Sequence, residues 1–389
     1  MEEFRVDEVA VAARRARAAA LATSSAVDAL VTRAGRAERL LDEELAALLL
    51  APGVATDTLL ALARAARPTG APRLETFSPL YMTNECDAEC LMCGMRGTNA
   101  ALARETADDA TVAEQLALLH RRGMRGVALL TGEYRHGPRR DAILRRVADA
   151  LRTALAAGFT HVLINVGSLE TADYDVLLAD VPRAADGRVD PRVTMCTFQE
   201  TYNPRAYARF MGTNDANPRS DYARRLTNFD RAADAGMWSV NPGVLLGLNE
   251  DLAEELLALL AHLTHLGTRG LDVYVSLPRL RKASGAPHTR GVGDDELARI
   301  VAVLGFGRPE AKVVISTREA PEIQRRLVPV IAVLTPGSPG VAPYTPTGAR
   351  FELEASQFEV LDHRPIEVIL GEVLAAGIAV DRYEPAHLA

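Results

Sequence analysis

Several features that mark common classes of protein are missing from this sequence of 389 residues. It has only four cysteines, three of them grouped, so it carries no disulfide framework and suits a reducing compartment. A net charge of −7 gives no basic surface for nucleic acid or an anionic membrane. No apolar run has the length of a membrane span, and no signal-type apolar stretch follows the charged N-terminal residues. We therefore expect a cytoplasmic protein with neither nucleic acid nor a membrane as its partner.

The usual motifs of hydrolases and nucleotide-binding proteins are missing as well. No Ser/His/Asp set, Walker loop or G-x-G-x-x-G fingerprint stands out. His262 and His265 lie in one amphipathic segment, where such a pair more often belongs to the surface or the core than to a metal site. The grouped cysteines are the remaining chemical signal.

Three cysteines follow one another with the spacing Cys-x3-Cys-x2-Cys, at Cys86, Cys90 and Cys93. Three thiolates on one short loop can hold three corners of a cubane [4Fe–4S] cluster and leave the fourth iron open to another molecule. The alternative is a structural zinc site, which needs four ligands in paired spacing. The nearest histidines, His120 and His136, form no such pair. The spacing therefore predicts an iron–sulfur cluster with an open iron.

The pattern of the chain changes near residue 74. Residues 1–73 show helix-period apolar positions and predict a helical N-terminal extension that packs on the rest. Residues 74–389 alternate short β-branched runs with amphipathic segments, which favours an α/β fold, a (β/α)8 TIM-like barrel with a closing helix and a final extended segment near 357–383. The predicted strands are 77–82, 125–131, 161–166, 192–198, 239–246, 271–277, 312–317 and 328–334, and the predicted helices lie near 109–122, 140–157, 171–180, 219–235, 251–267, 294–304 and 319–327.

Polar motifs gather just after these strands, at the end where barrel enzymes carry their reactive groups. In Thr131-Gly132-Glu133, the glycine lets backbone carbonyls approach a cationic amino group closely. By contrast, Cys196 lies inside the apolar strand 192–198, and we expect a small core residue there. The other motifs at strand ends are Asn165-Val-Gly167-Ser168, Gln199-Glu200-Thr201-Tyr202, Ser276-Leu-Pro278-Arg279 and Ser316-Thr317-Arg318-Glu319.

The cysteine motif resembles the signature of the radical S-adenosylmethionine (SAM) superfamily. Within that superfamily, the motifs that contain Glu200, Ser276 and Arg318 make the chain similar to the aromatic amino acid lyases. The likeness runs from about residue 74 to 380 and is greatest to the tryptophan lyases of nosiheptide-type thiopeptide assembly, the 3-methyl-2-indolic acid synthases. The stretches that carry it are Cys86-Asp-Ala-Glu-Cys90-Leu-Met-Cys93-Gly-Met-Arg96, Val193-Thr-Met-Cys196, Arg209-Phe-Met-Gly212, Val240-Asn-Pro-Gly243 and Thr335-Pro-Gly-Ser-Pro339 with Ala342-Pro-Tyr344.

This resemblance implies a [4Fe–4S] cluster on the three cysteines, SAM beside it, and an electron donor such as flavodoxin or ferredoxin. Thr131-Gly132-Glu133 resembles the Gly-Gly-Glu motif that holds the amine of SAM. A guanidinium from the predicted helix 219–235, either Arg225 or Arg231, is expected to meet the SAM carboxylate. The implied cofactor-binding residues are Thr131, Gly132, Glu133, Ser168, Glu200, Arg225 and Arg231.

Three residues are expected to contact the substrate. Arg318 ends the strand 312–317, where a guanidinium is a bidentate partner for the carboxylate of a free amino acid, unless it pairs with Glu319 or Glu322 instead. The family uses the arginine of this motif for the substrate carboxylate. Tyr81 matches a family tyrosine that lines the substrate pocket, and Thr335 stands where the tryptophan enzymes have a substrate-contacting serine, so the hydroxyl is kept.

The resemblance also implies a reaction. SAM is cleaved reductively, and the 5′-deoxyadenosyl radical takes a hydrogen from the amino group of L-tryptophan. Carbon–carbon scission at Cα follows, and the carboxyl-containing fragment re-adds to indole C2 to give 3-methyl-2-indolic acid, with loss of ammonia and a one-carbon fragment. The alternatives are an L-tyrosine lyase that forms p-cresol and dehydroglycine, and a cluster-binding homologue without catalysis. The C-terminal cysteines of the hydrogenase-maturation lyases are missing, which argues against synthesis of carbon monoxide and cyanide.

Overall fold

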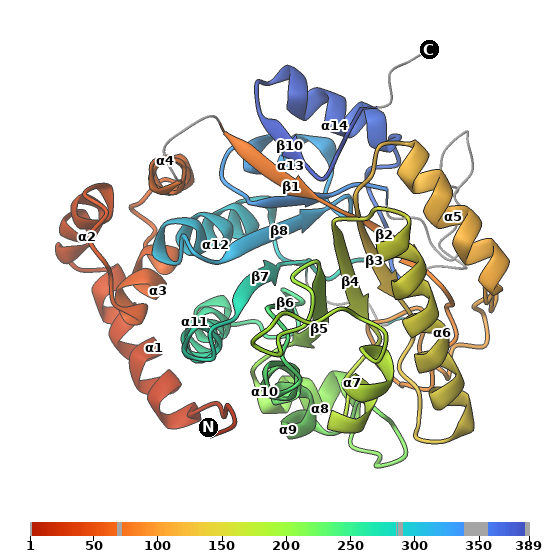
Figure 1. The fold of residues 1–389 in the computed structure, drawn as a ribbon. Helices are drawn as coiled ribbons and strands as arrows, with labels where there is room; N and C mark the ends of the chain where they lie inside the picture. Colours follow the sequence, from red (N-terminus) through yellow and green to blue (C-terminus); the bar gives the residue numbers. More distant parts are fainter. Residues whose placement is uncertain (1, 68–71, 285, 287–290, 338–356, 386–389) are drawn as a thin grey trace.

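A parallel sheet of ten strands occupies the centre of the computed structural model, which describes residues 2–67, 72–284, 286, 291–337 and 357–385 (Figure 1). The order across the sheet is β10-β1-β9-β8-β7-β6-β5-β4-β3-β2, so eight strands follow the chain one after another. The strands are β1 (Arg73–Thr76), β2 (Ser78–Tyr81), β3 (Gly126–Leu130), β4 (His161–Asn165), β5 (Val193–Glu200), β6 (Ser239–Val244), β7 (Asp272–Ser276), β8 (Lys312–Ser316), β9 (Val333–Thr335) and β10 (Ala379–Asp381).

The segment that contains β1 and β2 joins the two ends of this sheet. Only Phe77 separates the two strands; β1 pairs with β9 and β10, whereas β2 pairs with β3. The hydroxyl of Thr76 donates to the carbonyl of Leu334 at 2.8 Å, and the N–H of Met82 donates to the carbonyl of Leu130 at 2.8 Å. The sheet is therefore curled into a barrel, as predicted, and one short stretch of backbone contacts both ends of the strand order.

Helices cover the outer surface of the curled sheet (Figure 1). Their apolar faces pack on the strands because each helix buries residues at helical spacing, such as Leu256, Leu259, Leu260 and Leu263 in α11. The helices that follow β2 are α5 (Asp109–Arg121), α6 (Pro138–Ala156), α7 (Thr171–Leu177), α8 (Pro204–Met211), α9 (Tyr222–Leu226), α10 (Asn228–Asp234), α11 (Leu252–Thr268), α12 (Asp294–Gly307), α13 (Pro321–Leu327) and α14 (Ile366–Ala375).

Four further helices precede the barrel and lie beside α11 and α12 (Figure 1). The guanidinium of Arg299 in α12 donates to the carbonyls of Leu48, Leu49 and Ala51 at 2.8–2.9 Å, and so satisfies backbone acceptors at the C-terminal end of a helix of this group. These contacts attach the N-terminal helices to the barrel. The N-terminal helices are α1 (Glu8–Ala22), α2 (Ala26–Gly35), α3 (Asp42–Leu50) and α4 (Thr56–Ala66).

The structure corrects two of the predicted elements. The predicted strand 328–334 begins only at Val333, and Val328 instead is the C-cap residue of α13. Val330 and Ile331 are apolar because they are buried in the turn between helix and strand. The predicted helix 219–235 is two short helices, α9 and α10, which are separated at Thr227. Pro339 and the stretch Ala342–Tyr344, which contributed to the resemblance, lie outside the described residues.

Candidate functional site

The three motif cysteines follow β2 at the C-terminal end of the barrel strands, as barrel enzymes require of reactive groups. Cys90 and Cys93 are buried and Cys86 is partly buried. The backbone N–H groups of Glu133 and Ala88 donate to the sulfur of Cys86 at 3.3 and 3.4 Å. Hydrogen bonds of this kind to sulfur are one of the means by which a protein tunes an iron–sulfur cluster.

All three cysteines line one cavity inside the mouth of the barrel. It contains about 1280 Å³ of free space, including its opening to solvent. Its walls include the substrate candidates Tyr81, Arg318 and Thr335 and the cofactor candidates Thr131, Gly132, Glu133, Glu200 and Arg225.

The arrangement of the thiols differs from that of a mononuclear metal site. Within the described ranges, no group of three His, Cys, Asp or Glu side chains is arranged to hold a metal ion. A zinc ion needs its ligands at about 2.0–2.3 Å from one centre, whereas each thiolate of a cubane cluster binds a different iron. Burial raises the pKa of Cys86 to about 11 and that of Cys90 to about 12, and a bound metal would deprotonate both thiols.

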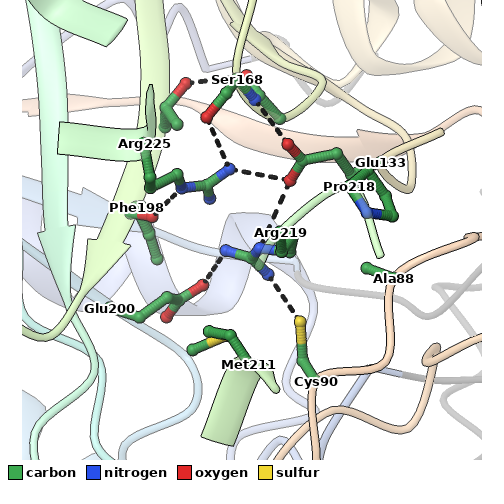
Figure 2. A network of polar contacts seen from close by, with 12 residues as sticks. Ala88, Cys90, Glu133, Ser168, Phe198, Glu200, Met211, Pro218, Arg219 and Arg225 are labelled. Atoms are coloured by element: carbon green, nitrogen blue, oxygen red, sulfur yellow. Dashed lines mark hydrogen bonds and ion pairs between the residues drawn. The ribbon is translucent and has the colours of Figure 1, made fainter. Parts of the chain in front are cut away.

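Glu133 lies at the centre of a buried polar network (Figure 2). One carboxylate oxygen accepts from the backbone N–H of Ser168 at 3.0 Å, and the other accepts from the guanidinium of Arg225 at 2.8 Å. The Nε of Arg225 also donates to the carbonyl of Phe198 at 2.7 Å. Three of the predicted residues, Glu133, Ser168 and Arg225, are thus brought into direct contact and fixed in orientation.

Arg219 completes this network, although no sequence signal had indicated it. Its guanidinium lies 2.6 Å from Glu200, 3.3 Å from Glu133 and 3.4 Å from the sulfur of Cys90 (Figure 2). Burial alone would lower the pKa of Arg219, but the charges of Cys90, Glu200 and Glu133 keep it well above its ordinary value. Arg219 is therefore a permanent cation beside the cysteine loop.

The backbone around Glu200 has a conformation that aims this side chain into the site. The pairing of β5 with β6 is irregular between Phe198 and Glu200, and Glu200 has a φ of +70°. Bulges and left-handed non-glycine residues often redirect side chains at functional sites. Here the bulge turns the carboxylate of Glu200 toward Arg219.

Arg318 lies in the same cavity, two residues beyond β8. Its guanidinium carbon is 3.3 Å from the centre of the Phe358 ring, a cation–π contact, and burial lowers its pKa to about 10. Among the described residues no carboxylate pairs with it, because Glu319 pairs with Arg279 and Arg281 instead. The arginine remains charged at neutral pH, and no carboxylate of the described residues forms an ion pair with it.

Tyr81 lies beside Arg318. Its hydroxyl donates to the side-chain carbonyl of Gln357 at 3.2 Å, and burial raises its pKa to about 12, so the phenol stays neutral at physiological pH. Thr335 is buried at the end of β9 and also lines the cavity. Gln357 and Phe358 come from the chain after β9, and the sequence offered no signal that would place them here.

Arg231, which was also predicted to bind the cofactor, is not among the residues that line this cavity. Its guanidinium donates to the carbonyl of Leu169 at 2.6 Å, to the hydroxyl of Thr227 at 2.7 Å and to the carbonyl of Arg224 at 2.7 Å. All three nitrogens are thus used to join α10 to neighbouring loops. Of the two arginines considered, Arg225 is the one that lines the cavity.

The residues present fit an iron–sulfur cluster with SAM beside it. Gly132 approaches the cysteine loop so closely that a Cβ there would lie 2.1 Å from the carbonyl oxygen of Glu85 and 2.6 Å from the Cβ of Cys86. The Thr131–Glu133 backbone is therefore packed directly against the loop, where carbonyls can reach a ligand amine. The donor set of three thiols, buried carboxylates and guanidinium groups matches a cluster and a zwitterionic ligand.

Comparisons with known proteins agree with this geometry. No protein-family model matches the chain. It is 27% identical over 309 residues to 2-iminoacetate synthase of Escherichia coli (strain K12), covering 78% of this chain and 75% of that protein, and 26% identical over the same length to the Salmonella typhimurium protein of that name. This similarity supports an enzyme of the radical SAM type that uses a [4Fe–4S] cluster and SAM.

Solved structures show the same fold. The X-ray structure of the FeFe-hydrogenase maturase HydG from Carboxydothermus hydrogenoformans has a TM-score of 0.81 at 22% identity, over 98% of this chain and 87% of that one. Methylornithine synthase (PylB) has a TM-score of 0.68 at 16% identity, over 90% and 97% of the two chains. None of the helices in the described ranges is long and apolar enough to cross a membrane.

Proposed function

We propose that the chain converts L-tryptophan to 3-methyl-2-indolic acid. The observation that carries the proposal is Arg318, a partly buried cation without a carboxylate partner in the described structure, which shares one cavity with the three motif cysteines. A free amino acid supplies the missing carboxylate. The choice of tryptophan rests on the motifs shared with the tryptophan lyases, among them Val240-Asn-Pro-Gly243.

In this proposal, the chain's own residues position two molecules. When bound, the cluster and SAM supply a carbon-centred radical that removes a hydrogen atom from the substrate amine. Arg318 holds the substrate carboxylate, and the neutral phenol of Tyr81 beside it restricts how that carboxylate can turn. The hydroxyl of Thr335 offers a further contact to the polar end of the substrate. Together these groups decide which hydrogen faces the radical.

A second group of residues is assigned to SAM. We propose that Thr131, Gly132 and Glu133 receive its amine, with Glu133 oriented by Arg225 and Ser168. The carboxylate of Glu200 is assigned to the ribose or the charged end of SAM.

The SAM carboxylate is assigned to Arg225, which lines the cavity. Arg219 is the second guanidinium within reach of the same place, because it lies between the sulfur of Cys90 and Glu200.

The reaction is tested with anaerobically reconstituted, reduced enzyme, SAM and one aromatic amino acid at a time. We expect L-tryptophan to give 3-methyl-2-indolic acid together with 5′-deoxyadenosine, measured by mass spectrometry. L-Tyrosine is expected to give little product coupled to 5′-deoxyadenosine. Release of p-cresol from L-tyrosine, with L-tryptophan inert, would refute the choice of substrate.

The role of Arg318 is tested by Arg318→Ala. Loss of a charge-assisted bidentate contact costs a few kcal/mol, so turnover should fall on the order of a hundredfold. The remaining 5′-deoxyadenosine should no longer be coupled to product, while SAM binding persists. The control is Arg152→Ala, because Arg152 lies on the exposed side of α6 with a side chain 56% exposed. Wild-type coupling in Arg318→Ala would place the carboxylate site elsewhere.

A tyrosine lyase that forms p-cresol and dehydroglycine is the second candidate. It is supported by the two relatives named 2-iminoacetate synthase, which align with 78% of this chain. Arg318 and Tyr81 would serve tyrosine equally well, because they contact the part that both amino acids share. The two candidates therefore differ in what the ring meets deeper in the cavity.

A further inference from the structure

One buried polar side chain in the cavity has an unused hydrogen-bonding atom. Asn241, on β6, is 1% exposed and lines the cavity. Its Oδ1 accepts a hydrogen bond from the hydroxyl of Ser276 at 3.0 Å, whereas its Nδ2 has no partner within the described residues. Buried amides usually have all their groups satisfied, and an unmade hydrogen bond costs free energy. A buried amide with one unpaired hydrogen-bonding group is suited to bind a ligand that supplies the missing partner.

Asn241 lies deeper in the barrel than the residues assigned to the substrate carboxylate. It precedes the last residue of β6, Val244, by three positions and pairs in register with Cys196, in the middle of β5. Arg318 lies two residues beyond the end of β8. Because the strands are parallel, Arg318 is at the mouth and Asn241 is inside. An amino acid held by Arg318 at the mouth therefore directs its ring toward the level of Asn241.

The cavity wall around Asn241 is mostly apolar. Phe77, Ala128 and Val314 line the cavity and belong to one buried cluster inside the barrel together with Cys196. The walls thus suit an aromatic ring, and the Asn241 amide is a polar group among apolar side chains. A single polar group in an apolar pocket selects for a ring whose polar atom can form a hydrogen bond with it.

We propose that Asn241 is a specificity-determining residue that binds the indole N–H of the substrate. The proposal rests on the proposed function and goes beyond it by assigning the ring end of the pocket. A carboxamide can turn over and exchange its oxygen and nitrogen, and the Ser276 hydroxyl can accept as well as donate. With Nδ2 donating to Ser276, Oδ1 faces the cavity and accepts the indole N–H. A phenol oxygen would instead accept a hydrogen bond from Nδ2, in the orientation in which Oδ1 accepts from Ser276.

The test compares L-tryptophan with 3-(benzothiophen-3-yl)-L-alanine, which has sulfur in place of the indole N–H and nearly the same shape. The measured quantity is kcat/KM for substrate-dependent formation of 5′-deoxyadenosine. The wild-type enzyme should prefer L-tryptophan by about tenfold or more, since the analogue leaves the amide unpaired. In Asn241→Leu this preference should fall to near one. An unchanged preference in Asn241→Leu overturns the assignment.

A second variant separates an acceptor role from a donor role. Asn241→Asp keeps two acceptor oxygens and removes the donor, so it should retain the preference for L-tryptophan. Loss of the preference for L-tryptophan in Asn241→Asp overturns the indole assignment. If the wild-type enzyme turns over L-tryptophan but Asn241→Leu keeps the same preference for L-tryptophan over the analogue, only this inference is refuted. If the wild-type enzyme is inert toward L-tryptophan, the proposed function is refuted and the inference with it.

Discussion

Removal of the Arg219 guanidinium should destabilise the protein strongly, even without its cofactors. In Arg219→Met, Glu133 keeps its bonds to Arg225 at 2.8 Å and to the N–H of Ser168 at 3.0 Å. The carboxylate of Glu200 keeps no partner in the part of the chain that the structure describes. A buried charge left unpaired in this way typically costs about 3–5 kcal/mol. We therefore expect the free energy of unfolding to fall by about that amount.

The measurement is urea unfolding of the reduced protein without cluster, with the double variant Arg219→Met/Glu200→Gln as the decisive comparison. Neutralising Glu200 removes the unpaired charge, so the double variant should recover most of the loss. The control is Arg152→Met, because exposed ion pairs such as those of Arg152 contribute only about 0–1 kcal/mol. If Arg219→Met costs less than about 1 kcal/mol, or if Glu200→Gln brings no recovery, the buried network does not act as described.

Three further outcomes are expected. Cys90→Ala should abolish 5′-deoxyadenosine formation and the change in the EPR signal on addition of SAM; unchanged SAM cleavage would exclude Cys90 as a cluster ligand. Gly132→Ala should lower the iron content after reconstitution, because its Cβ would lie 2.1 Å from the carbonyl oxygen of Glu85; a full iron complement would show that the loop can shift without cost. Burial raises the pKa of Glu255 to about 7, above its unfolded value, so its contribution to stability is present at low pH and is lost as the pH rises through about 7. Urea unfolding at pH 5 and pH 8 should therefore show a fall of about 3 kcal/mol that is smaller in Glu255→Gln; equal pH dependence in both proteins would contradict this.

The sequence predicted the parts of the fold whose signal is local. Strands such as 126–130 and 161–165 are apolar runs between amphipathic helices, and their predicted bounds differ from the observed ones by at most one residue at each end. The short strand β1 was not predicted, because four residues carry too little pattern, whereas β10 lies in the predicted final extended segment. The cysteine spacing and the polar residues after the strands likewise predicted which residues meet at the barrel mouth.

Residues whose role depends on distant partners were beyond sequence reasoning. Arg219 was predicted at the start of the helix 219–235, but it lies in the loop before α9. Its contacts with Cys90 and Glu200, which come from other segments of the chain, have no signal in the local sequence. Arg225 and Arg231 were predicted on one helix. The break at Thr227 separates them, so that Arg225 lines the cavity, whereas Arg231 donates hydrogen bonds to neighbouring loops.

The stretch from β1 to β2 has a consequence for how the chain is made. Its first half pairs with β9 and β10, so its backbone groups find their partners only after some three hundred further residues have been synthesised. Until then, the first strands of the barrel expose an open edge, which is prone to pair with other chains. Removal of the residues from Ala379 onward would leave that edge permanently uncovered, and such a truncated chain should aggregate rather than fold.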